Sequence, residues 1–234
     1  MIIIPVIDLL DGQVVHALKG ERASYAPIQS SLTNSSYPEA ILNAYLDLYP
    51  FKTFYVADLN AIQKKGNNFA YINTLSLHFP DITFWLDAGI EDIIKQESVY
   101  NHNFIQPVIG SENKPSAEIL NRINYQHPDW ILSLDKFDDE FIGVDDLFNS
   151  TQYWPKQVIM MMLNKVGTSS GIDIQALNRK PELHQKHQLY FAGGVANKSD
   201  LIKLSDNGYA GALIATALHN RRLDNDSITE IMEN

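Results

Sequence analysis

Eight short apolar runs, separated by segments with helical spacing, recur along the whole chain. Such a run is typical of a strand buried on both faces, as in a parallel sheet that helices cover. Eight regular strand–helix units predict a closed (β/α)₈ barrel of the α/β class. An open doubly wound sheet would instead carry a glycine-rich turn after its first strand, and Asp8–Gly12 is not such a turn. The predicted strands are Ile2–Ile7, Thr53–Ala57, Ile82–Leu86, Phe104–Ile109, Trp130–Leu134, Gln157–Leu163, Leu189–Ala192 and Ala212–Ala215.

The segments between these runs predict helices of ordinary length. Ser36 precedes the first as a candidate cap, and Asn197 is the expected N-cap of the last. Ala17–Tyr37 is polar and has no clear period, which predicts a long mobile loop. The predicted helices are Pro38–Leu48, Tyr71–Leu77, Glu91–Tyr100, Pro115–Ile123, Val144–Gln152, Ile174–Asn178 and Asn197–Leu204.

The chain also repeats itself. The turn Asp58–Asn60 parallels Met162–Asn164 at a shift of 104 residues, and Ala88–Ile90 parallels Gly193–Val195 at a shift of 105. Gly110 parallels Ala215 at the same shift of 105. We therefore predict one domain over residues 1–234, built from two half-barrels at about 1–123 and 124–234.

The composition excludes several classes of functional site and of partner. The chain has no cysteine, which excludes thiol catalysis, disulfides and thiolate metal sites. Its formal net charge of −10 argues against nucleic-acid and anionic-membrane partners. The opening apolar run lacks a basic flank, and no run approaches the ~20 apolar residues of a membrane span. No His, Asp and Glu cluster has metal-ligand spacing. We expect a cytoplasmic protein without a metal.

Two carboxylates follow predicted strands at the end where barrels place their active sites. Asp8 ends the first strand and Asp135 the fifth, so they should face each other across the barrel mouth. Two carboxylates in a cleft work as general acid and base when burial raises one pKa. The alternative is that each Asp only caps its loop. The repeat favours the catalytic interpretation.

The Gly193–Gly194 turn after the seventh strand and the Ala215–Leu218 segment after the eighth predict an anion site. Loops at this position commonly bind phosphate, because exposed amides and a helix dipole favour negative charge. The alternative is a plain turn. The predicted phosphate-binding residues are Gly193, Gly194, Ala215 and Thr216, with Gly110 and Ser111 as the symmetric site in the first half.

Taken together, these residues resemble the histidine-biosynthesis barrel family of ribulose-phosphate-binding type. It contains the phosphoribosylformimino-aminoimidazole-carboxamide ribotide isomerase and the cyclase subunit of imidazole-glycerol-phosphate synthase. The resemblance covers nearly the whole chain, and the opening stretch is closer to the isomerase. It rests on Ile3–Gly20, Asp58–Ala61 with Gly66 and Asn68, Val108–Gly110, Leu134–Asp135, Gly167–Thr168 with Ser170–Gly171, and Ala192–Val195.

The resemblance implies an isomerase that converts a ring-opened aminoaldose into an aminoketose, an Amadori rearrangement that needs one acid and one base. It implies two phosphate sites for a bisphosphorylated substrate, with Asp8 as the base. No cofactor and no glutaminase partner is implied. The motif residues Gly20, Asp58, Gly167 and Thr168 become further substrate-binding candidates.

The chain departs from the family pattern at three places. Val166 stands where the family has its acid, an Asp before Gly-Thr, which leaves Asp135 as the candidate. Asp87 and Glu91 flank the first-half phosphate site, where like charge disfavours an anion. Ala215–Thr216 replaces a frequent Gly-Arg. Besides the isomerase, two alternatives stay open: a diverged lyase or synthase of another cofactor or one-carbon pathway, and a phosphoribosyl-binding barrel without turnover. Two carboxylates in one mouth favour an enzyme.

Overall fold

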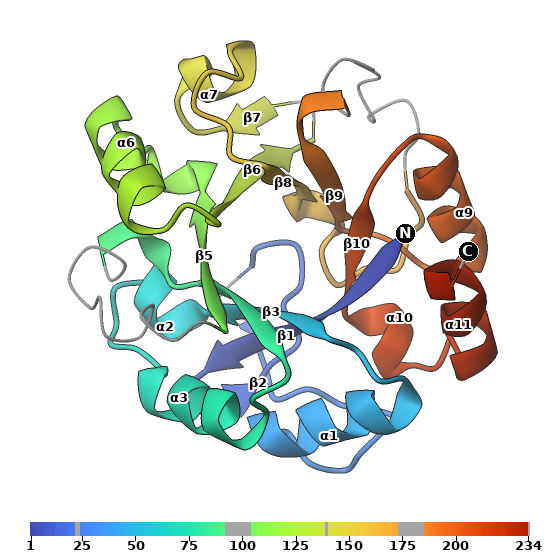
Figure 1. The fold of residues 1–234 in the computed structure, drawn as a ribbon. Coiled ribbons are helices and arrows are strands. Elements are labelled where there is room, and N and C mark those ends of the chain that lie inside the picture. The colour runs from blue at the N-terminus through green and yellow to red at the C-terminus, as the bar shows by residue number, and fades with distance from the viewer. Residues whose placement is uncertain (22–23, 92–103, 139, 173–184, 234) are drawn as a thin grey trace.

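The chain folds into a closed barrel of eight parallel strands. The structure is a computed structural model that describes residues 1–21, 24–91, 104–138, 140–172 and 185–233. Strand β1 pairs with β3 on one side and with β10 on the other, which closes the sheet (Figure 1). The barrel strands in spatial order are β1 (Ile2–Leu10), β3 (Thr53–Asp58), β4 (Thr83–Asp87), β5 (Ile105–Gly110), β6 (Ile131–Phe137), β8 (Gln157–Met162), β9 (Gln188–Ala192) and β10 (Gly211–Ile214). The predicted (β/α)₈ barrel is confirmed.

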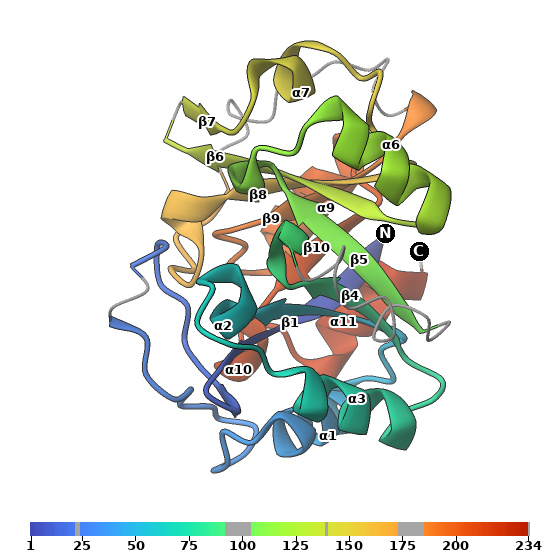
Figure 2. The ribbon, with the colours of Figure 1, turned by 90° about the vertical axis from the view of Figure 1, so that its left-hand side faces the viewer.

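Two short strands extend the barrel sheet at its C-terminal end. β2 (Gln13–Val14) runs antiparallel to β1, and β7 (Glu140–Ile142) runs antiparallel to β6. Helices lie around the barrel in Figures 1 and 2. They are α1 (Pro38–Leu48), α2 (Leu59–Ile62), α3 (Phe69–His78), α6 (Ala117–Gln126), α7 (Asp145–Asn149), α9 (Lys198–Asp206), α10 (Thr216–His219) and α11 (Asn225–Glu233), with 3₁₀ turns η2 (Ser111–Asn113) and η3 (Leu163–Lys165).

Strand alternation sorts the side chains into two layers. Successive residues of a strand point to opposite faces, so one set faces the barrel axis and the other faces the helices. On β1, Ile4 belongs to the interior layer, whereas Ile3 and Ile7 pack in the layer under the helices. The interior is filled by large side chains such as Trp85 and Tyr190, whose ring centroids lie 4.8 Å apart. The barrel is therefore a packed core with its opening at the strand ends.

Most predicted elements agree with the structure to within a few residues. Asn197 caps α9 as expected, since its side chain accepts a hydrogen bond from the Asp200 amide. The prediction of Ser36 as a cap is wrong: Tyr37 is the N-cap of α1 and makes no side-chain cap bond, while Pro38 presets the first helical φ. The predicted helix Glu91–Tyr100 lies outside the described residues except for Glu91, which is helical, and the predicted helix Ile174–Asn178 lies outside them altogether.

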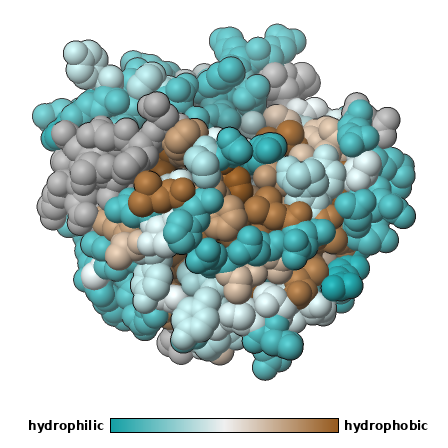
Figure 3. Space-filling view, turned by 60° about the horizontal axis from the view of Figure 1, so that its bottom comes forward, coloured by the Kyte–Doolittle hydropathy of each residue, from teal (hydrophilic) through white to brown (hydrophobic). Residues whose placement is uncertain are grey.

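The two ends of the chain meet at one side of the barrel. The Met1 amino group donates to the Ile231 carbonyl at 3.4 Å, and α11 packs against α9 and β1 (Figure 1). No helix in the described part of the chain is long and apolar enough to cross a bilayer. On the face drawn in Figure 3, apolar surface gathers at the centre between hydrophilic rims. Superposition of the two half-barrels stays a prediction.

Candidate active site

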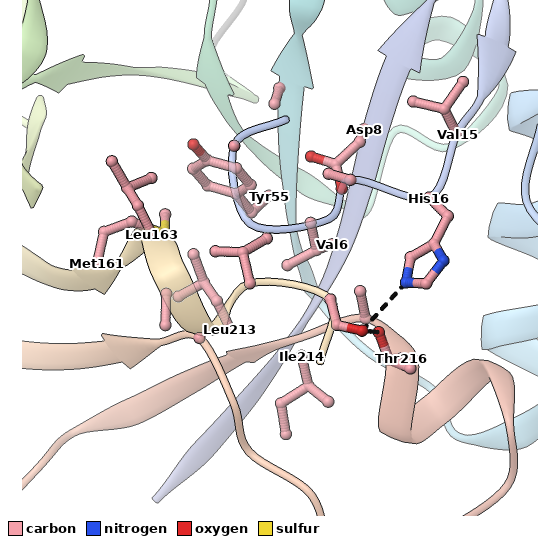
Figure 4. A pocket seen from close by; sticks show the side chains of 18 of the residues that line it. Val6, Asp8, Val15, His16, Tyr55, Met161, Leu163, Leu213, Ile214 and Thr216 are labelled. Carbon is pink, nitrogen blue, oxygen red and sulfur yellow. Dashed lines mark hydrogen bonds between the residues drawn. The ribbon is translucent and has the colours of Figure 1, made fainter. Parts of the chain in front are cut away.

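A large pocket opens at the C-terminal end of the barrel strands. It holds about 1160 Å³ of space, including the part open to solvent, and its walls come from the strand ends and the loops after them (Figure 4). Asp8 and Asp135 both line it, from strands four places apart in the closed barrel order. The two carboxylates therefore lie in one pocket, as the sequence predicts. Alternation explains it for Asp8, which follows Ile4 and Val6 on the inward face of β1.

Asp8 has a carboxylate without a hydrogen-bond partner among the described residues. The side chain points into the pocket near Tyr55 and Val6 (Figure 4). Burial raises the pKa of the Asp8 carboxyl from 3.8 to about 7. A carboxylate that titrates near neutral pH and lacks an internal donor is suited to exchange a proton with a ligand.

Asp135, in contrast, is held by three donors. Its Oδ1 accepts from Ser133 Oγ at 2.9 Å, and its Oδ2 accepts from Ser111 Oγ at 3.2 Å and from the Glu112 amide at 3.1 Å. Only 5% of the residue is exposed. Burial raises the pKa of Asp135 to about 6, and the three hydrogen bonds limit that rise because they favour the charged form.

Asp87 is a third carboxylate of the pocket, which the sequence analysis assigned instead to the rim of a phosphate site. It follows Trp85 on the inward face of β4, so alternation turns it toward the axis. Only 8% of it is exposed, and burial together with the charges of Asp135 and Glu112 raises its pKa to about 7. One feature of the sequence could have indicated this role: Asp87 ends a predicted strand, as Asp8 does.

Tyr55 lies among the three carboxylates. Its hydroxyl donates to Asp87 Oδ2 at 3.1 Å. Burial and the charges of Asp87, Asp8 and Asp135 raise the pKa of Tyr55 well above 10, so the hydroxyl keeps its proton. Figure 4 shows the Tyr55 ring within the pocket, with its hydroxyl turned away from Asp8. No sequence motif distinguished this tyrosine from the aromatic residues of the barrel core.

The loops after β8, β9 and β10 form the opposite side of the pocket. Among the predicted phosphate-binding residues, those that line the pocket are Gly20, Gly167, Gly193, Gly194, Ala215 and Thr216. Gly194 has φ +83°, and an added Cβ would lie 2.9 Å from the Gly171 carbonyl oxygen, so only glycine fits there. The Lys165 side chain lies against Gly194, and Lys165 Nζ has no ion-pair partner within the described residues.

Two histidines close this side of the pocket. His16 Nε2 lies 3.1 Å from the Gly167 carbonyl oxygen, which also accepts from Thr216 Oγ1 at 3.3 Å (Figure 4). His219 is buried, and its ring nitrogens lie 2.7 Å from Tyr45 Oη and 2.9 Å from Ser30 Oγ. Burial lowers the pKa of His219 to about 4, so the ring is neutral at physiological pH. His219 thereby fastens the long 17–37 loop to the barrel.

Four predicted binding residues do not line the pocket. Asp58 is fully buried and faces the helix layer, because Tyr55 and Ala57 take the inward positions of β3; its carboxylate accepts from Ala61 and Asn68. Gly110 and Ser111 lie against Asp135, and Ser111 Oγ is also bonded to the Ile142 carbonyl. The remaining one is Thr168, whose hydroxyl donates to the Lys165 carbonyl oxygen.

A smaller hollow lies beside the first-half turn after β4. Glu91, Glu112 and Lys64 line it, and Lys64 Nζ pairs with Glu91 Oε1 at 2.6 Å on the surface. Glu112 belongs to both this hollow and the main pocket. Within the described ranges, no group of three or more His, Cys, Asp or Glu side chains is arranged to hold a metal ion.

Comparison with known proteins finds relatives that match nearly the whole chain. A family model described as "Histidine biosynthesis protein" matches residues 2–224. An uncharacterised protein of Methanocaldococcus jannaschii is 29% identical over 233 residues, which cover 97% of each chain. A relative from Myxococcus xanthus, described as 1-(5-phosphoribosyl)-5-((5-phosphoribosylamino)methylideneamino) imidazole-4-carboxamide isomerase, is 28% identical over 97% of this chain and 98% of its own. A relative with the same description from Natronomonas pharaonis is 25% identical over 93% of this chain and 92% of its own.

Proposed function

The chain belongs to the histidine biosynthesis protein family, and on that premise we propose that it is an aldose–ketose isomerase acting on a phosphorylated aminoaldose. Asp8 is the base in this proposal. The observation that carries it is the Asp8 carboxyl itself, which lines the pocket without an internal donor and has its pKa raised to about 7. A base is most effective when its pKa lies near the working pH.

The acid of the proposed reaction lies across the pocket. Val166, at the position of the family's acid, lines the pocket and cannot donate a proton. Burial and the charge of Asp135 raise the pKa of Asp87 to about 7, so we assign the acid to this pair, in which Asp87 holds the proton near neutral pH. Assigning the proton to the pair extends the expectation from the sequence, which named Asp135 alone.

The steps follow from these two groups. The acid protonates the ring oxygen and the C1–O bond breaks, which leaves an open-chain imine with positive charge on nitrogen. Asp8 then takes the C2 proton, and the C2–H electron pair forms the C1–C2 double bond while nitrogen becomes neutral. The enaminol hydroxyl returns its proton to the acid, and C1 takes a proton from Asp8 to give the aminoketose.

Phosphate binding in this proposal belongs to the loops after β8, β9 and β10. Support comes from the Gly194 turn, from the N-terminal end of α10 at Thr216, and from the Lys165 side chain, whose Cβ and Cδ lie against Gly194. The positions of these loops also set the proposed orientation of the substrate. A substrate anchored by phosphate on this side extends across the pocket, past Asp8, toward Asp87 and Asp135.

The test is proton exchange at the reacting carbon. Purified protein in D₂O is mixed with a phosphorylated aminoaldose, either the bisphosphorylated compound of the relatives or phosphoribosylamine, and ¹H NMR follows deuterium uptake at C1 and C2. We expect enzyme-dependent uptake that Asp8→Asn lowers by about 10²–10⁴-fold. Glu118→Gln, an exposed acid on α6, is the control and should not change the rate. Uptake that persists in folded Asp8→Asn protein contradicts the assignment of Asp8 as base.

A further inference from the structure

One end of the pocket is built from apolar side chains, which we name the apolar end wall: Val15, Tyr25, Leu59 and Ile62. All four line the pocket. Val15 and Leu59 are each only 5% exposed, whereas Tyr25 and Ile62 are half-buried and pack against the cluster that contains the other two. A β-bridge between Val15 and Pro27 holds the Tyr25 segment beside this cluster. Tertiary packing thus joins three separate parts of the chain into one apolar surface.

The apolar end wall lies across the pocket from the loop after β8. Leu59 and Ile62 belong to α2, which directly follows β3, and β3 stands four places from β8 in the closed order of eight strands. Tyr55, on β3, belongs to the same apolar cluster and donates to Asp87. A substrate that is held by its phosphate at the loops after β8, β9 and β10 and extends past Asp8 toward Asp87 therefore reaches this wall.

The turn amides at this end of the pocket are already bonded within the protein. The Gly89 amide donates to Asp87 Oδ1 at 3.2 Å, and the Glu112 amide donates to Asp135 Oδ2 at 3.1 Å. Among the described residues, no Lys or Arg side chain lines the pocket. Proteins bind phosphate through free backbone amides or through cationic side chains. A second phosphate at this end would therefore lack the donors that it needs.

Apolar side chains that stay partly exposed inside a pocket favour an apolar ligand. Tyr25 and Ile62 keep part of their surface accessible to solvent where they line the pocket. A ligand group that covers this surface removes it from water, which is favourable roughly in proportion to the apolar area buried. An apolar group also needs no hydrogen-bond donor, so it suits an end of the pocket whose turn amides are already bonded.

We propose that the substrate is a phosphate monoester with an uncharged apolar arm, and that this arm packs against the apolar end wall where a second phosphate would otherwise lie. The position of the phosphate rests on the proposed function. The arm rests on the four apolar side chains and on the bonded amides of Gly89 and Glu112. The substrate class therefore differs from a bisphosphorylated compound at the end that reaches Leu59 and Ile62.

The test compares three phosphates that differ at the end away from the anchored phosphate. Isothermal titration calorimetry at pH 7.5 measures the Kd of 3-phenylpropyl phosphate, propyl phosphate and 1,6-hexanediol bisphosphate for the full chain. We expect 3-phenylpropyl phosphate to bind at least about tenfold more tightly than propyl phosphate, because its phenyl group is buried, and the bisphosphate to bind no more tightly than propyl phosphate. Equal affinities for the two monophosphates, or a preference for the bisphosphate, would overturn the proposal.

Substitutions at Ile62 locate the effect. Ile62→Thr should weaken binding of 3-phenylpropyl phosphate at least about fivefold and leave the Kd of propyl phosphate unchanged, because only the phenyl arm reaches Ile62. Ile62→Val, a milder change, should give a smaller loss and keeps the test decisive where Ile62→Thr does not fold. The matched control is Ile202→Thr, since Ile202 is 42% exposed on α9 and does not line the pocket.

Methyl NMR gives a second readout of the same contact. In protein with ¹³C-labelled Ile and Leu methyl groups, the ring current of the bound phenyl group should shift the Ile62 and Leu59 signals and leave that of Ile202 in place. Equal shifts at Ile62 and Ile202, or an Ile62→Thr variant that binds both monophosphates as the wild type does, would also overturn the proposal.

The outcomes separate this proposal from the proposed function. If both monophosphates bind and the phenyl group gives no gain, the apolar arm is wrong and the phosphate anchor stands. If 3-phenylpropanol binds as tightly as its phosphate, the phosphate anchor fails and the contact with the apolar end wall stands. If none of the three phosphates binds, both proposals are wrong about how the pocket recognises its substrate.

Discussion

The two sides of the barrel mouth share a backbone plan and differ in what they do with it. On the β4–β5–β6 side, the turns after the strands donate their amides to Asp87 and Asp135, carboxylates of the chain itself. On the β8–β9–β10 side, Gly194 and Thr216 line the pocket, and no carboxylate from the described residues of this side does. The same kind of turn thus supports an internal anion on one side and is open to an external one on the other.

The two sides of the pocket differ because of the residues at equivalent strand ends. Gly110 and Ala215 occupy equivalent places in the predicted repeat, at the end of β5 and just after β10. Gly110 leaves room for the Asp135 carboxylate, whose Oδ2 would lie 3.2 Å from an added Cβ. Ala215, in contrast, lines the pocket at the start of α10. A few side chains at strand ends therefore decide the charge of each side of the pocket.

The largest expected effect concerns the acid missing at Val166. We expect the wild-type protein to turn over the bisphosphorylated aminoaldose of the relatives poorly, and Val166→Asp to raise kcat about 10²-fold, because it places a proton donor on the β8 side. The KM for this substrate should stay high, since the carboxylates of Asp87, Glu112 and Asp135 in the pocket still repel its second phosphate. Val166→Asn, which fills similar space without an acid, is the control. A wild-type kcat on the order of 1–10 s⁻¹ or more would show that no acid is missing.

The next effect is on the free energy of unfolding and tests how much the buried carboxylates Asp8, Asp87 and Asp135 destabilise the fold when they are ionised. Burial raises the folded-state pKa of Asp8 and Asp87 from 3.8 to about 7 and that of Asp135 to about 6. Between pH 4 and 7 the folded state therefore binds more protons than the unfolded state, and stability falls as pH rises through the folded-state values. His219, with its pKa lowered to about 4, acts in the opposite direction below pH 6.5.

The measurement is urea unfolding at pH 5.5 and pH 8. The free energy of unfolding should be larger at pH 5.5 by roughly 2–3 kcal/mol after the opposing effect of His219. Asp87→Asn should stabilise the protein at pH 8 by about 1–2 kcal/mol and change it little at pH 5.5. Glu118→Gln should change neither value. A protein that is more stable at pH 8 would show that ionising the buried carboxylates of the pocket does not destabilise the fold.

A smaller effect tests the other side. Gly194→Ala introduces a Cβ at φ +83° and 2.9 Å from the Gly171 carbonyl oxygen, so the turn must shift. We expect the affinity for glucose 6-phosphate to fall about tenfold, which calorimetry measures. Gly66→Ala is the matched control, because Gly66 also has a positive φ, +101°, but has nothing within 4 Å of the new Cβ. Equal loss of affinity in both variants would assign the effect to strain alone.

The sequence predicted the barrel and the strand ends because buried parallel strands leave a clear hydrophobic signal. It also predicted that Asp8 and Asp135 face one barrel mouth, and both line the pocket there. It did not predict which way Asp58 and Asp87 point. That orientation depends on strand register by a single residue: Asp58 ends β3 on the outward face, whereas Asp87 ends β4 on the inward face. Tyr55 was missed for the same reason, because an aromatic residue in a strand predicts core in either orientation.

The smallest expected effect concerns the hydrogen bond that joins Tyr55 to Asp87. Tyr55 Oη donates to Asp87 Oδ2 at 3.1 Å, and this bond favours the charged carboxylate and lowers its pKa. Tyr55→Phe should therefore raise the pKa of Asp87 further above about 7, by less than about one unit, since a single hydrogen bond contributes about 1 kcal/mol. Carbon-13 NMR of labelled Asp carboxyls, assigned with Asp87→Asn, measures the shift. Tyr190→Phe is the matched control, because its hydroxyl meets Gln157 and Gln188 at the other end of the barrel interior. A lowered Asp87 pKa in Tyr55→Phe would mean that Tyr55 instead accepts the Asp87 proton and so stabilises the neutral acid.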